Sequence, residues 1–155
     1  MRTCATGGRW NSRGIASVEL AIALPVLLLL LTAIVEVGRL LSEYDTLTKS
    51  VRNAARYLAA NAFQGTTGIV NITAAVQSAT ANLVVTGNVN GTGAALLPGL
   101  VSGNVVVTNL GAGYVSVSAS YTYQPILGAT LPTFRRGPRI ALGFPLQTTT
   151  VMRAL

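Results

Sequence analysis

The sequence GIASVELAIALPVLLLLLTAIV, residues 14–35, decides the fold, because it predicts one long apolar helix. From residue 15 to residue 35 the only ionisable side chain is that of Glu19. At about 1.5 Å per residue this segment is roughly 32 Å long, and the hydrocarbon core of a bilayer is about 30 Å thick. We therefore predict a membrane-spanning helix over residues 15–36.

Glu19 needs a partner or an interface, because a carboxylate at the centre of a spanning helix costs about 2.5–3.5 kcal/mol. Cleavage after Gly14 would give Ile15 a free α-amino group, which could pair with Glu19 on the same helix or on a neighbouring one. The alternative is that Glu19, only about 6 Å along the helix from Ile15, reaches headgroups or water.

Residues 14–39 also carry a recognisable pattern: a Gly before the helix, then Val-Glu-Leu-Ala at 18–21, Leu-Pro at 24–25, a block of leucines, and Glu-Val-Gly-Arg at 36–39. This pattern resembles the TadE-like pseudopilins of tight-adherence (Flp, type IVb) pilus systems. The resemblance implies cleavage between Gly14 and Ile15 by an aspartic prepilin peptidase, with Glu19 as the fifth mature residue, used in subunit registration. Leu20 departs from the family, which usually has an aromatic residue there.

Three further residues are candidates for contacts between subunits. Pro25 cannot donate a hydrogen bond to the carbonyl of Ala21, so it bends or loosens the helix. Such a compliant point could help subunits slide into a filament, or it could be an incidental kink. Glu36 and Arg39 lie where the helix leaves the membrane; they contact other subunits, or they form surface ion pairs at i,i+3 (Glu36 with Arg39) and i,i+4 (Arg39 with Glu43).

Beyond the membrane, we predict an amphipathic helix over residues 37–63 and a small α+β domain over residues 64–155. The helix prediction rests on apolar residues at intervals of three or four, and residues 44–62 should complete the core of the domain. In the domain, residues 73–84 predict a second helix with Thr73 as its cap. Residues 104–110 and 114–123 predict two strands joined at residues 111–113, and residues 147–153 predict a closing strand.

The predicted fold class is therefore α+β and pilin-like, a long helix lying across a small antiparallel sheet. Residues 1–14 are the predicted cytoplasmic leader. Arg2, Arg9 and Arg13 precede the span and favour a cytoplasmic N-terminus, with the domain exported. A cleaved secretion signal has similar features. Such a signal, however, has a shorter apolar stretch that is followed by an Ala-x-Ala-like site. No such site follows the leucines here.

The predicted domain lacks the residues of most catalytic and metal sites. The 155-residue chain has no histidine, its one cysteine is Cys4 in the leader, and no acid follows Asp45. A general acid/base pair or a metal shell needs such groups. We therefore expect no enzyme activity, no metal and no cofactor. Arg135, Arg136 and Arg139 could bind acidic polymers at a surface or could form a solvated loop, and no aromatic array predicts specific recognition of nucleic acid.

The leading hypothesis is a minor pilin of a tight-adherence pilus, single-pass in the inner membrane, that takes part in pilus assembly and adhesion. Its expected partners are the prepilin peptidase, the major and other minor pilins, the inner-membrane assembly platform and membrane lipid. The alternative is an inner-membrane anchor whose outer domain binds a partner without entering a filament. A third possibility is an adhesin that grips acidic polymers through the three arginines.

Overall fold

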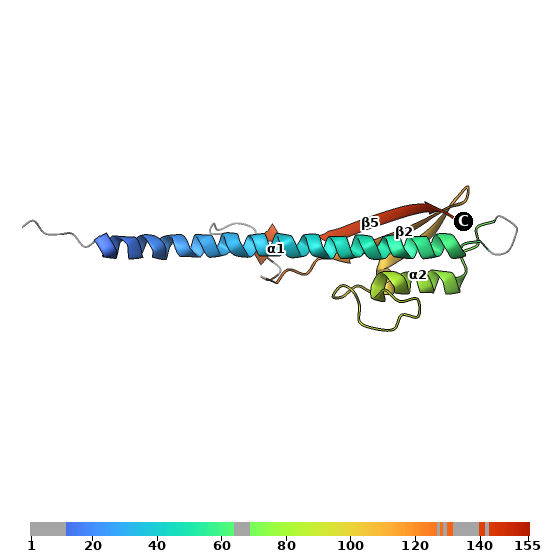
Figure 1. The fold of residues 1–155 in the computed structure, drawn as a ribbon, viewed down its shortest axis with the longest axis horizontal. Helices are drawn as coiled ribbons and strands as arrows, with labels where there is room; N and C mark the ends of the chain where they lie inside the picture. Colours follow the sequence, from blue (N-terminus) through green and yellow to red (C-terminus); the bar gives the residue numbers. More distant parts are fainter. Residues whose placement is uncertain (1–11, 64–68, 127, 129, 132–139, 142) are drawn as a thin grey trace, which may run out of the picture. The chain divides into compact units, whose positions relative to one another are not determined.

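The computed structural model describes residues 12–63, 69–126, 128, 130–131, 140–141 and 143–155. The chain divides into two compact units, Met1–Val37 and Gly38–Leu155. Figure 1 shows the elements, which are α1 (Ser12–Asn61), α2 (Ala74–Thr86), a 3-10 turn η1 (Ser102–Asn104), β1 (Val105–Gly111), β2 (Tyr114–Thr122), β3 (Thr130–Leu131), β4 (Ile140–Ala141) and β5 (Pro145–Arg153). The predicted α+β class, with a long N-terminal helix and a small antiparallel sheet, is confirmed.

The first unit contains the apolar part of α1. Pro25 lies inside this helix, which continues on both sides of it. The large aliphatic side chains from Ile15 to Val35 are 40–71% exposed, so this unit does not bury them itself. A helix this long and this apolar could cross a membrane.

In the second unit, the later part of α1 packs its apolar stripe into the core. The residues of this stripe are buried at intervals of three or four, as the helix period requires: Leu47, Val51, Ala54, Ala55, Leu58, Ala59 and Ala62. The prediction that the part of this stripe in the core includes Tyr44 was wrong, because Tyr44 is 41% exposed and full burial begins at Leu47. The helix also ends at Asn61, short of residue 63, because Phe63 already pairs with Val70 in an isolated β-bridge.

Opposite this stripe lies a three-stranded antiparallel sheet in the order β1-β2-β5. Its central strand β2 pairs Val117 with Val107 of β1 and with Thr150 of β5. The alternation predicted for residues 114–123 is confirmed on the inner face, where every second residue is at most 3% exposed: Val115, Val117, Ala119, Tyr121 and Tyr123. On the outer face Ser116 was expected to be wet, yet it is 7% exposed, because larger neighbours flank its short side chain on a twisted sheet.

The second helix has the predicted start. The Thr73 hydroxyl accepts a hydrogen bond from the Val76 N–H at 3.4 Å, which satisfies one of the free donors of the first turn. The helix ends at Gly87, whose φ of 72° is a left-handed conformation that only glycine adopts without cost. The cap N–H donates to the Leu83 carbonyl at 3.1 Å.

The turn between β1 and β2 places a non-glycine residue at a positive φ. Gly111 and Tyr114 pair across a two-residue turn whose central residues, Ala112 and Gly113, have φ values of 51° and 79°. Both central positions of a type I′ turn need φ above zero, which favours Asn-Gly. We expect Ala112→Asn to raise the free energy of unfolding by about 0.5–1 kcal/mol, because asparagine tolerates this region better than alanine. Chemical unfolding in mild detergent tests this, and Ala112→Val should have the opposite sign.

Candidate functional site

The predicted cleavage residues lie in an accessible part of α1. Gly14 and Ile15 are exposed, and they belong to the first turn of the helix. A Cβ atom added at Gly14 would meet no heavy atom within 4 Å. The described protein therefore does not itself require glycine at this position. A requirement for glycine would have to come from an enzyme that reads the site.

Glu19 lies one helical turn after Ile15 and is exposed. Residues four apart share one face of a helix, so an amine on Ile15 and the Glu19 carboxylate would lie on the same side. Glu19 forms no ion pair with any described residue. Pro25, two turns further along, is also exposed.

The residues that follow the apolar segment are charged and partly buried. In the second unit, the Nε atom of Arg39 lies 3.0 Å from Oε1 of Glu43, which confirms the predicted i,i+4 ion pair. Glu43 is only 8% exposed. Asp45 and Lys49 form a second i,i+4 pair at 2.6 Å, in which both side chains are largely exposed. Glu36, in the first unit, is buried.

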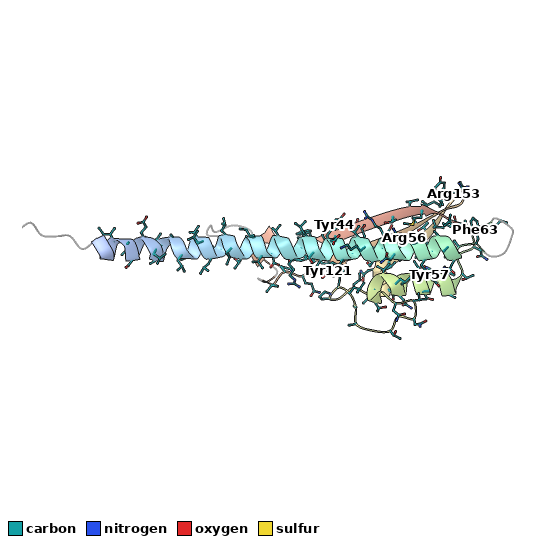
Figure 2. All side chains as sticks on the ribbon, viewed as in Figure 1. Tyr44, Arg56, Tyr57, Phe63, Tyr121 and Arg153 are labelled. Atoms are coloured by element: carbon teal, nitrogen blue, oxygen red, sulfur yellow. The ribbon has the colours of Figure 1, made fainter. Side chains whose placement is uncertain are left out.

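Tyr121 of β2 joins Arg39 and Glu43 in a polar cluster, and the sequence did not reveal this contact. The hydroxyl of Tyr121 and Oε2 of Glu43 are buried and have no hydrogen-bond partner among the described residues. Burial, and to a lesser extent the neighbouring Glu43 carboxylate, raise the pKa of Tyr121 to about 12, while Arg39 opposes the shift. Figure 2 shows Tyr121 beside the helix. The helical spacing signalled Arg39 and Glu43, but it could not indicate which strand faces them.

The raised pKa of Tyr121 predicts a loss of stability in alkaline solution. The folded state holds the phenol proton up to about pH 12, whereas the unfolded chain releases it near pH 10. Stability is therefore fully present below pH 10 and falls between pH 10 and 12 by about 2 kcal/mol. Unfolding curves at pH 9 and 11.5 measure this fall. Tyr121→Phe should remove it, while Tyr114→Phe, at an exposed tyrosine, should leave it unchanged.

Other predicted sites receive less support from the structure. Arg135, Arg136 and Arg139, the candidates for surface binding, lie outside the described residues. Arg52 and Arg56 of α1 are exposed, and Lys49 is paired with Asp45. No group of three or more His, Cys, Asp or Glu side chains in the described ranges could hold a metal ion.

Most of the predicted site residues thus lie on α1, from its exposed start to the partly buried pair of Arg39 and Glu43. Residues 14–56 match the family of TadE-like proteins. The match begins at Gly14 and confirms the resemblance found in the sequence. It also covers Glu19, Pro25, Glu36 and Arg39. No curated protein and no solved structure matches the chain.

The family match does not extend to the sheet. It ends within α1, before β1, β2 and β5 begin. The roles of the domain and of its surfaces therefore have to be argued from the structure.

Proposed function

We propose that the protein is a minor pilin of a tight-adherence pilus, cleaved after Gly14 and built into or onto the fibre through α1. One observation carries the proposal: the TadE-like match begins at Gly14, near the start of a helix whose large apolar side chains are exposed in their own unit. Uncovered apolar surface on this scale needs lipid or other helices around it.

The charged groups near the start of α1 determine the proposed orientation in the membrane and the proposed order of processing and assembly. The N-terminus stays in the cytoplasm, the membrane holds residues 15–36, and the domain is exported and takes part in adhesion. A prepilin peptidase removes residues 1–14, and the new ammonium of Ile15 neutralises Glu19 within apolar surroundings. The helix then packs beside the helices of the major and other minor pilins, on the inner-membrane assembly platform. The protein acts by assembly, not by catalysis.

Terminal analysis tests the processing step. Mass spectrometry of the membrane protein, from cells with an active prepilin peptidase, should give a chain that starts at Ile15. We expect Gly14→Val to slow this cleavage about tenfold or more, because a peptidase that reads a Gly-Ile junction meets a side chain there. Gly38→Val is the matched control, since a Cβ at Gly38 also meets nothing within 4 Å. Recovery of only intact Met1 from the unmutated protein would contradict the proposal.

Fractionation of cells tests whether the protein reaches the surface fibres or stays in the inner membrane. A minor pilin should co-purify with sheared surface fibres, in far smaller amounts than the major subunit. A cleaved protein found solely in the inner membrane would favour the alternative function, a permanent anchor with an outer binding domain. The two tests separate processing from assembly.

A further inference from the structure

A cleft opens at the end of the domain where α1 stops. Its volume is about 530 Å³, within the usual range for small-molecule sites. Three segments that are far apart in the sequence line it: Phe63, Ile69 and Val70 after α1, the turn between β1 and β2, and the end of β5. Figure 2 shows Phe63 and Arg153 at this same end of the domain. We call this space the distal cleft.

Arg153 gives the distal cleft its charge. It is the only charged residue among the described residues that line the cleft. Arg153 forms no ion pair with any described carboxylate, and the sequence has no Asp or Glu after Asp45. Glu43 and Asp45 are already paired with Arg39 and Lys49. An exposed guanidinium without an Asp or Glu partner suits a carboxylate from outside, which it can bind through two parallel hydrogen bonds.

The rest of the lining offers apolar surface and neutral hydrogen-bonding groups. Phe63 is half-buried, and Val70 pairs with it in the β-bridge. The Asn109 amide donates one hydrogen bond to the Val70 carbonyl at 3.4 Å and accepts one from the Gly111 N–H at 2.9 Å, which leaves its second N–H available. Ala112 and Gly113, at the centre of the tight turn, add backbone polar groups to the wall.

We infer that the distal cleft binds an acidic sugar, with the carboxylate on Arg153, the apolar face of the sugar ring against Phe63, and the hydroxyls on Asn109 and the turn. A sugar acid combines one charge, one apolar face and several hydroxyls, which is the combination that the lining offers. An acidic peptide fits less well, because its carboxylates come without the apolar ring face and the hydroxyls that suit Phe63, Asn109 and the turn. This inference rests on the proposed function and names acidic sugars as the class of ligand that the domain binds in adhesion.

A binding assay on the purified full chain in mild detergent tests this without requiring a pilus. Trigalacturonate is the probe, and its fully methyl-esterified form is the neutral counterpart with the same rings. We expect calorimetric titration at low salt to show saturable binding of trigalacturonate, at least tenfold tighter than binding of the ester. Arg153→Gln should weaken binding by about tenfold to a hundredfold, since a hydrogen bond to a charged group contributes about 1.5–3 kcal/mol.

Controls separate the cleft from general attraction between charges. Arg52→Gln removes an exposed arginine from α1, outside the cleft lining, and should leave the affinity unchanged. Phe63→Ala should weaken binding of trigalacturonate several-fold while circular dichroism stays unchanged. Equal binding of the ester, equal losses in R52Q and R153Q, tighter binding of a capped tri-aspartate peptide, or no binding at all would each overturn the inference. Because the assay needs neither cleavage nor assembly, its failure would leave the pilin proposal standing.

Discussion

Replacing Glu19 with Gln is expected to reduce incorporation into pili about a hundredfold while cleavage after Gly14 continues. The glutamine is nearly isosteric, so the helix should form as before, but the ammonium of Ile15 loses its counter-charge. An unpaired charge within apolar helices costs about 2.5–3.5 kcal/mol, which corresponds to roughly a hundredfold in an equilibrium. Immunoblotting of sheared fibres against the membrane fraction measures the ratio.

The control for this experiment is an acid outside the apolar segment. Asp45→Asn removes a carboxylate whose ion pair with Lys49 is exposed, and such pairs contribute little. Incorporation of D45N should therefore stay within twofold of the unmutated protein. If E19Q assembles as well as D45N, charge pairing between Ile15 and Glu19 has no role in assembly.

Leu58→Ala is expected to lower the free energy of unfolding of the second unit by about 2–5 kcal/mol. Leu58 is fully buried in α1 at the centre of the apolar stripe, and it belongs to the same core cluster as Val117 of the sheet. Truncation removes buried methyl groups and leaves a cavity that the surrounding side chains fill only in part. Urea unfolding in mild detergent, followed by the fluorescence of the buried tyrosines, measures the change.

Leu41→Ala is the matched control on the same helix. Leu41 is 59% exposed, so its truncation should change stability by no more than about 0.5 kcal/mol. Similar losses in L41A and L58A would mean that α1 does not pack on the sheet through the face described. A loss confined to L58A would support the packing of the second unit.

Periodic patterns predicted the parts of the fold that depend on neighbouring residues in the sequence. The intervals of three and four from Leu47 to Ala62, and the alternation from Val115 to Tyr123, each reflect one face turned toward the core. Thr73 could be predicted as a helix cap because its hydroxyl acts on the next turn of its own helix. Gly14 and Glu19 were proposed as site residues in the same way, since their positions are defined relative to the apolar helix.

Features that depend on distant segments could not be predicted in this way. Tyr44 continues the apolar stripe of α1, and only the finished domain determines that full burial of its apolar residues begins at Leu47. The contact of Glu43 with Tyr121 needs the register between helix and sheet. The distal cleft likewise brings Phe63 and Arg153 together from opposite ends of the domain sequence, and no local pattern links such residues.

The order of strands in the sheet has a consequence for handling the purified protein. With β2 in the centre, β1 and β5 each have one long side that no other described strand pairs with. Such sides favour edge-to-edge aggregation at high concentration, which proline and charged residues oppose. Pro145 and Arg153 stand only at the two ends of β5, and the residues between them are uncharged. A lysine in place of the exposed Val151 should therefore keep concentrated samples monodisperse for longer.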